Sequence, residues 1–337
     1  MTRLNNIYAK IKNFIAQNYK FLLLIIGLNL LFIVELPYVI YRPGGTVNLS
    51  DRISVDNGFT SKGKIQMAYV SMMRGSLPFV LVSNFIPNWD LASKSQITLE
   101  DETIREMMER DRIYLEQSIN NATIVAYDAA GKNLEIKRNI NTVVFISREA
   151  DTNLQIGDEL THVNGEKILD LEEYREIINE HSVGDTLELT VNRNGRKRDA
   201  QIKVFEAEEG LRTGISLVTT YELEMEPPLV IRSRNSESGP SGGLMLSLGI
   251  YDALVKEDIT KGRNIVGTGT ITKDGKVGEI GGVRYKLMGA VRNRADIFMC
   301  PQDNYAEAVR VKKERNYNII VIGVSTFEEA LRKLREV

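Results

Sequence analysis

The residue best placed to do chemistry is a serine in a glycine-rich turn. Ser241 lies in the run GPSGG, between Pro240 and Gly242, and an apolar pattern of helical spacing begins directly after it. This order predicts that Ser241 lies at a helix N-terminus, where backbone N–H groups have no partner within the helix. Such amides can stabilise an oxyanion, and glycines let a substrate backbone approach closely. A phosphate site or an ordinary loop would show the same pattern, although no P-loop motif G-x-x-x-x-G-K-[ST] occurs in the chain.

A nucleophilic serine needs a base, and the usual base is scarce in this chain. The two histidines, His162 and His181, both precede residue 206. The other base that the sequence offers is Lys286, which stands among apolar residues after a Gly-Gly pair. A lysine can act as a base when burial lowers its pKa from about 10.4 towards roughly 7–8. Taken alone, such a lysine is more often a surface residue with a buried stem, so only the pair indicates catalysis.

An apolar segment near the N-terminus predicts a membrane anchor. Residues 21–41, FLLLIIGLNLLFIVELPYVIY, are long enough to cross the hydrocarbon core of a bilayer as a helix. Residues 1–20 carry four basic and no acidic side chains. The positive-inside rule therefore predicts a cytoplasmic tail at 1–20 and an extracytoplasmic remainder. A cleaved signal peptide would need a small-x-small site, which YRPGGTV lacks, and a buried soluble helix is the other alternative.

Three regions follow the anchor, and together they predict an α+β fold. Residues 42–139 show strand-like alternation followed by helical spacing between residues 103 and 122. Residues 140–206 contain short strands around DLEEYREIINEH, a helix that we expect to begin at the N-cap Asp170. Residues 207–337 alternate strands and helices and contain both Ser241 and Lys286.

The middle region, 140–206, resembles a bacterial PDZ domain. The resemblance rests on the Gly157-Asp158 turn before a strand, the Asn164-Gly165 turn, the following helix and the strand start at Gly184. It implies that an extended peptide, often a C-terminus, binds as an added strand beside the helix at 170–181. The carboxylate-binding loop is not recognisable, and a PDZ domain that only spaces or regulates its neighbour is the alternative.

The surroundings of Ser241 and Lys286 resemble the Lon-type protease domain. The GPSxG motif of that family is matched by GPSGG, and the strand TGTIT, the turn KDGKV and the lysine-bearing GEIGGVRYK follow in the same order. The resemblance implies a Ser–Lys dyad in which Ser241 is the nucleophile and Lys286 the general base. It also implies that Thr268 hydrogen-bonds the lysine, and that Pro240 and Gly242 support the dyad or the oxyanion hole.

The resemblance to Lon continues upstream and has two departures. GKIQMAYVS to LEQSINNATIVAYDAAG resembles the first half of the Lon protease domain, which implies a PDZ domain inserted in or preceding the catalytic part. ATP-dependent Lon proteins carry an acidic residue where this chain has Ser238, and a glutamate where it has Thr270. Both departures concern the details of activation and leave the dyad in place.

The whole arrangement resembles the membrane-anchored, PDZ-containing Lon-like peptidases of bacteria. This implies an ATP-independent serine endopeptidase that cuts exported peptides or membrane-protein ectodomains at the outer side of the cell membrane. Lon-type domains commonly form rings, so the resemblance also implies a homo-oligomer. Two other functions stay open, namely a non-catalytic PDZ scaffold that binds extracellular peptide tails, and an acyl-transfer or amidase enzyme of the cell envelope.

The amino-acid composition argues against several classes of partner and site. The net charge of −2 argues against nucleic-acid binding, because no excess of cations is available for a phosphate backbone. The single cysteine, Cys300, cannot form an intramolecular disulfide or a cysteine-based zinc site, and its apolar neighbours predict a buried strand. We expect no cofactor and no metal.

Overall fold

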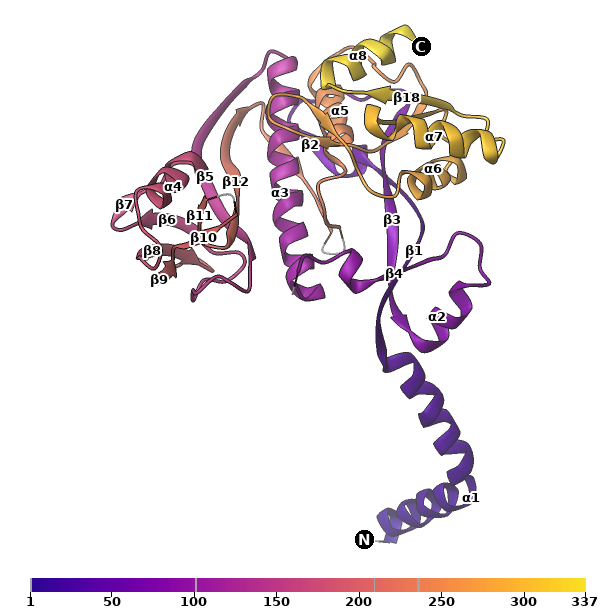
Figure 1. Ribbon diagram of the computed structural model, residues 1–337. Helices are drawn as coiled ribbons and strands as arrows, with labels where there is room; N and C mark the ends of the chain where they lie inside the picture. Colours follow the sequence, from indigo (N-terminus) through magenta and orange to yellow (C-terminus); the bar gives the residue numbers. More distant parts are fainter. Residues whose placement is uncertain (1, 101, 209, 235–236) are drawn as a thin grey trace. The chain divides into compact units, whose positions relative to one another are not determined.

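The computed structural model describes residues 2–100, 102–208, 210–234 and 237–337, with side chains from residue 5 onward. The predicted domain ranges also span residues 1, 101, 209, 235 and 236, which lie outside the described residues. The chain forms two compact units. Unit 1 contains residues 1–42 and 71–97, and unit 2 contains residues 43–70 and 98–337. Figure 1 traces the helices and strands of both.

The N-terminal apolar segment is helical, but the predicted limits of its helix are wrong. Helix α1 covers Thr2–Ile33, and strand β1 covers Glu35–Asn48, so the last residues of the predicted span 21–41 are strand. Glu35 and Pro37 explain the early end, because a carboxylate is costly in a bilayer and a proline ring clashes with a preceding helical turn. By length and composition, Asn5–Ile33 can cross a membrane.

The rest of unit 1 follows strand β3 (Lys64–Ser76), whose last residues belong to this unit. Helix α2 (Leu77–Ser83) has a proline in its first turn, where the missing N–H costs nothing. Strand β4 (Asp90–Ser93) pairs antiparallel with β1, so that Tyr38 faces Ser93, and the short 3₁₀ helix η2 (Lys94–Gln96) comes next.

The main sheet of unit 2 joins segments that lie far apart in the sequence. Its order is β18-β17-β14-β3-β1. Strand β14 (Asn264–Gly267) pairs in parallel with β3 on one side and with β17 (Ile297–Pro301) on the other. Strand β18 (Ile320–Val324) pairs with β17. Since β3 precedes residue 140 and β14 follows residue 207, the predicted PDZ region is inserted between two parts of one sheet.

Four helices contact this sheet directly, and a fifth packs against one of the four. They are α3 (Ile104–Ala129), α5 (Gly243–Leu254), α6 (Val283–Arg292), α7 (Gln302–Glu314) and α8 (Phe327–Glu336). Thr103 caps α3, and Glu106 completes the capping box, so the expected helix forms and extends further than the pattern between 103 and 122. Helix α5 is apolar on all sides and buried along most of its length, and its side chains form the centre of the larger core.

The inserted region has its own sheet and its own core. The sheet order is β12-β5-β6-β8-β9, with β7 beside β6, and a separate hairpin pairs β10 with β11. Their bounds are β5 (Asn133–Ile146), β6 (Glu159–Val163), β7 (Glu166–Lys167), β8 (Thr186–Arg193), β9 (Arg196–Lys203), β10 (Phe205–Ala207), β11 (Gly210–Arg212) and β12 (Ile215–Glu226). Helix α4 (Leu171–Asn179) begins as expected, because the Asp170 carboxylate accepts hydrogen bonds from two backbone N–H groups of its first turn. Since β12 pairs with β5 along its length, this sheet extends beyond the range 140–206.

Short two-stranded pairings complete unit 2. Strand β2 (Ile53–Val55) pairs with β13 (Leu229–Ile231), and β15 (Thr270–Ile271) pairs with β16 (Val277–Gly278). The 3₁₀ helix η1 (Leu49–Asp51) joins β1 to β2. The β13–β2 pair connects residues just upstream of Ser241 to the first part of the unit.

Truncating a leucine of α5 should destabilise the fold. Leu248 is fully buried in the larger core, so Leu248→Ala is expected to lower the free energy of unfolding by roughly 2–5 kcal/mol. Leu169, which is 52% exposed, is the matched control, and Leu169→Ala should change that free energy by less than about 0.5 kcal/mol. Urea unfolding followed by circular dichroism measures both, and equal effects would contradict a core centred on α5.

Candidate active site

Ser241 lies in the turn that leads directly into α5, as the glycine-rich pattern predicted. The residue is partly exposed, whereas the helix that follows it is buried. The Gly243 N–H donates to the Pro240 carbonyl at 3.2 Å, which closes the turn around Ser241. A serine at this position is accessible from outside and is nevertheless held by a rigid helix.

The glycines after Ser241 allow a close approach to the sheet. A Cβ atom at residue 242 would lie 2.0 Å from the Met67 sulfur, and one at residue 243 would lie 2.6 Å from Ile271 Cγ2. Because these contacts leave no room for a side chain, Gly242 and Gly243 bring the turn against β3 and β15. In this way Gly242 supports the position of Ser241.

Helix α3 holds the other side of the turn. The Ser118 hydroxyl donates to the Pro240 carbonyl at 3.0 Å, and the Gly239 N–H donates to the Asp111 carbonyl at 2.8 Å. Sequence reasoning did not identify either α3 residue. Neither Asp111 nor Ser118 lies in a recognisable local motif. The signal that could have identified them is the resemblance of the segment before residue 140 to the first half of a Lon protease domain.

Lys286 reaches the serine from the first turns of α6. Its Nζ lies 2.9 Å from Ser241 Oγ and 2.9 Å from Thr268 Oγ1. The residue is only 3% exposed, and its neighbours on α6, Leu287 and Met288, belong to a buried apolar cluster of unit 2. The structure therefore brings together the three residues that the sequence pattern separated by 27 and 18 positions.

Burial sets the protonation of this amine. Removal from water disfavours the charged form and lowers the pKa of Lys286 to about 8. Among the described residues no opposite charge offsets that effect, because the hydrogen-bond partners of the amine, Ser241 and Thr268, are neutral hydroxyls. About one tenth of the amine is therefore uncharged at pH 7 and about half at pH 8, and only the uncharged amine can accept a proton.

Thr268 connects the lysine to the backbone of the nucleophile. It is fully buried just after β14, and its hydroxyl accepts from Lys286 and donates to the Ser241 carbonyl at 2.9 Å. The Gly269 N–H donates to the same carbonyl at 2.8 Å. These two donors fix the peptide plane after Ser241 and so orient the N–H of Gly242.

The turn also offers unpaired donors. Within the described parts of the chain, the N–H groups of Ser241 and Gly242 have no acceptor. A substrate carbonyl attacked by Ser241 would lie beside these amides, which could stabilise the negative oxygen that develops. The arrangement thus places a partly exposed hydroxyl, a buried amine and two backbone N–H donors beside one another.

The other reactive side chains lie elsewhere. His162 is in β6, and His181 follows α4 and hydrogen-bonds the Ile177 carbonyl at 2.7 Å, so both belong to the inserted region as expected. Cys300 is fully buried in β17, which confirms the predicted buried strand. Burial raises the pKa of its thiol to about 12, so the thiol stays protonated.

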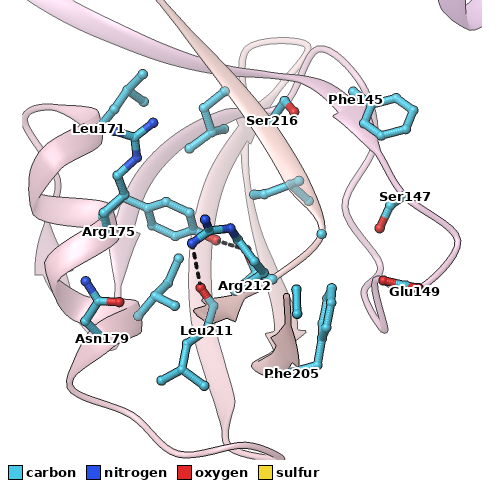
Figure 2. Close-up of a pocket in the computed structure, with 17 residues that line it drawn as sticks. Phe145, Ser147, Glu149, Leu171, Arg175, Asn179, Phe205, Leu211, Arg212 and Ser216 are labelled. Atoms are coloured by element: carbon cyan, nitrogen blue, oxygen red, sulfur yellow. Dashed lines mark hydrogen bonds between the residues drawn. The ribbon is translucent and has the colours of Figure 1, made fainter. Parts of the chain in front are cut away.

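The inserted region contains a groove of about 870 Å³. One face of α4 forms one wall, and the residues before and within the start of β12 form another. Figure 2 shows Leu171, Arg175 and Asn179 on the helix side, with Ser216 on the strand. Across the bottom of the groove, the hydroxyls of Tyr174 and Thr213 lie 2.9 Å apart. An open strand edge beside a helix is suited to binding an extended peptide.

Sequence reasoning identified the helix of this groove but missed its loop. The loop is Thr213-Gly214, followed by Ile215 and Leu217 on β12. Gly214 has φ +76°, and a Cβ atom there would lie 2.5 Å from the Ser147 hydroxyl, so the tight turn requires glycine. The signal that would have identified this loop is a Thr-Gly turn followed by alternating apolar residues. It lies after the predicted PDZ region 140–206 in the sequence, not before it.

Two family models match this chain. The PDZ domain model matches residues 130–204, and the model of the Lon protease (S16) C-terminal proteolytic domain matches residues 234–336. The chain thus joins a PDZ domain to a Lon-type serine protease domain. The Lon-type domain contains Ser241, Thr268 and Lys286, whereas the groove beside α4 belongs to the PDZ domain.

Known relatives are similar to parts of this chain. The Lon proteases of Neorickettsia sennetsu and Mesomycoplasma hyopneumoniae are 34% and 36% identical over 96 and 93 residues, which is 28% of this chain in each case. The serine protease Do-like HtrA of Lactobacillus helveticus is 38% identical over 77 residues, or 21% of this chain. The chain covers 11%, 10% and 19% of these relatives, respectively.

Solved PDZ domains also align with this chain. The PDZ domain of the SdrC-like protein from Listeria monocytogenes is 23% identical, with a TM-score of 0.23, and the alignment covers 25% of this chain and 93% of that one. The corresponding domain from Listeria innocua is also 23% identical, with a TM-score of 0.21, over 23% of this chain and 90% of that one.

Replacing Lys286 should change how stability depends on pH. With a pKa of about 8 when folded and about 10.4 when unfolded, this lysine binds fewer protons in the folded state between those values. The free energy of unfolding should therefore rise as pH rises from about 8 to about 10. We expect Lys286→Met to remove that rise and to stabilise the fold near pH 7 by about 1–3 kcal/mol.

The measurement is urea unfolding between pH 7 and pH 10. Lys313, an exposed lysine on α7, supplies the matched control, and Lys313→Met should keep the pH dependence of the wild type. An unchanged pH dependence in Lys286→Met would mean that the amine titrates as an ordinary lysine.

Proposed function

We propose that this protein is an ATP-independent serine endopeptidase with a Ser241–Lys286 dyad. The observation that carries the proposal is the position of one buried amine, which lies 2.9 Å from both Ser241 Oγ and Thr268 Oγ1. The match of residues 234–336 to a Lon-type proteolytic domain supports the same chemistry. Its substrates would be exported peptides or exposed loops of membrane-protein ectodomains.

In the proposed reaction Lys286 transfers one proton during acylation of Ser241 and another during hydrolysis of the acyl-serine. The uncharged amine accepts the Ser241 hydroxyl proton while Oγ attacks the substrate carbonyl carbon. The resulting ammonium gives that proton to the leaving amine as the peptide bond breaks, which forms an acyl-serine. A water molecule then attacks the acyl carbon, with Lys286 taking its proton and returning it to Ser241 Oγ.

Two further groups support this reaction. Thr268 holds the amine in line with Ser241 and fixes the Ser241 carbonyl, so it acts as a positioning residue. The N–H groups of Ser241 and Gly242 would form the oxyanion hole, and removal of such a donor typically costs about 10²–10³-fold in kcat. Pro240 shapes the turn through its carbonyl, which accepts from Ser118 and Gly243.

The proposal places the enzyme on the outer side of a membrane. Helix α1 is apolar enough to span a bilayer, and the first 20 residues carry four basic and no acidic side chains. The positive-inside rule then orients the PDZ and Lon-type domains away from the cytoplasm. In this location the PDZ groove would bind an extracytoplasmic peptide segment and deliver it to Ser241.

Single substitutions in the dyad test the catalytic proposal. In the full chain purified in detergent, without nucleotide, we expect an unstructured peptide library to be cleaved. Ser241→Ala should abolish cleavage, and Lys286→Ala should slow it by roughly 10²–10⁴-fold because the general base is lost. Mass spectrometry of the products measures both effects and also gives the cleavage preference.

The pH profile supplies an independent readout. Because the base is active only when uncharged, kcat/KM should rise with pH and level off above about 8. Ser182→Ala and Lys313→Ala, both at exposed positions, are the controls and should keep full activity. No cleavage by the folded wild type would favour a non-catalytic PDZ scaffold.

A charge reversal beside the groove tests the role of the PDZ domain. Arg175 is exposed on α4 and lines the groove, where its cation can attract a peptide carboxylate. If the groove captures substrates, Arg175→Glu should raise KM for peptides with a free C-terminus by about 10-fold, which corresponds to the loss of one charged contact. The value of kcat should be unchanged. Arg198→Glu, at an exposed position on β9, is the matched control, and equal effects of the two variants would contradict capture in the groove.

A further inference from the structure

Unit 1 has an apolar surface that its own core does not use. Helix α2 and the residue that follows its C-cap expose Leu77, Leu81, Val82 and Phe85, with exposed fractions of 36%, 58%, 44% and 86%. We call these four residues the apolar platform. Large apolar side chains that are exposed together are uncommon on a soluble protein and mark an interaction surface.

The spacing of the platform residues along the chain places them on one side of α2. Leu77, Leu81 and Phe85 lie four residues apart, so they follow one side of α2 and its continuation. Phe79 belongs to a different side of the same helix and packs inward. The platform is therefore a continuous stripe rather than a scatter of single residues.

The inward side of α2 contacts the candidate spanning helix. The ring of Phe79 meets the ring of Phe32, in the last turn of α1, edge to face with centroids 5.7 Å apart. Both residues belong to unit 1, so this contact lies within one compact body. The platform thereby continues the exposed apolar surface at the end of α1, where Ile33 is 70% exposed and Val34 is 54% exposed.

Charge is absent from the platform and present at its borders. The sequence from Gly75 to Trp89 contains no charged residue. On one border Arg74 pairs with Glu35, the first residue of β1, at 2.6 Å. On the other border the Arg42 guanidinium lies 5.7 Å from the centre of the Trp89 ring. An apolar surface bordered by tryptophan and arginine matches the order of groups at the boundary between acyl chains and headgroups.

From these observations we infer that the apolar platform inserts into the outer surface of the lipid bilayer beside α1. The inference rests on the proposed role of α1 as a membrane anchor and adds a second, non-spanning contact. The occupant is lipid rather than a peptide, because the platform is uncharged and is continuous with the helix that enters the bilayer. The protein would then be held to the membrane at two points instead of one.

Site-directed fluorescence on the full chain in lipid nanodiscs tests this inference. A cysteine replaces Phe85, which is 86% exposed and thus adds little to packing, and is labelled with an environment-sensitive dye. The native Cys300 is fully buried, and the unsubstituted chain reports any labelling of it. The nanodiscs contain phosphatidylcholine and phosphatidylglycerol, with or without lipids that carry a spin label near the headgroup end of the acyl chain.

Two further labelled positions separate this inference from the anchor itself. Leu24→Cys lies within α1 and reports whether that helix is in the bilayer, and Val230→Cys, which is 53% exposed in unit 2, is the aqueous control. We expect the dye at Phe85 to lose about half its emission with the spin-labelled lipid, as for an apolar face that lies about 5–10 Å into the interface. The dye at Val230 should be unaffected.

Each outcome bears on one proposal. Quenching at Leu24 without quenching at Phe85 would overturn the platform inference and leave the anchor intact. An apolar emission spectrum at Phe85 without lipid quenching would identify a protein partner, such as a second copy of this chain, and would also overturn it. Absence of quenching at Leu24 would instead contradict the anchor.

Discussion

A buried amine with a lowered pKa is the feature around which the site in the Lon-type domain is arranged. Lys286 is buried on α6, and within the described parts of the chain its polar contacts are the hydroxyls of Ser241 and Thr268. A carboxylate in the same place would keep the amine charged and end its use as a base. Removal of the Lys286 amine from water thus has two effects: it lowers the pKa of the amine to about 8, and it lowers the free energy of unfolding near neutral pH.

That arrangement depends on chain segments from both sides of the PDZ insertion. Strand β3 lies against Gly242 through Met67, and α3 holds the turn through Ser118. Helix α3 also contacts β12 of the PDZ sheet, since the Gln117 amide donates to the Thr219 carbonyl at 3.3 Å and the Tyr221 N–H donates to Asn120 at 2.7 Å. One helix therefore contacts both the nucleophile turn and the strand whose start lines the PDZ groove.

Several elements could be predicted from the sequence because their signals are local. The turn at Ser241, the capped helix at Asp170 and the buried strand around Cys300 each have a pattern within a few residues. The predicted end of the membrane helix was wrong by several residues, because the apolar run continues into strand β1, whose first residues include Glu35 and Pro37. The PDZ loop at Gly214 was missed because it follows the domain in sequence and meets α4 only in the folded state.

The sequence by itself determined the residue types and their order, namely a serine in a glycine turn, a threonine at the start of the predicted strand TGTIT and a lysine among apolar residues. It also determined that no histidine follows residue 206. Only the tertiary structure decided that the lysine amine lies 2.9 Å from both hydroxyls and that Ser118 supports the turn from a segment before the insertion. The reason is physical, because burial and hydrogen-bond distance depend on how β3, β14 and α6 pack, and no local pattern encodes contacts between segments so far apart.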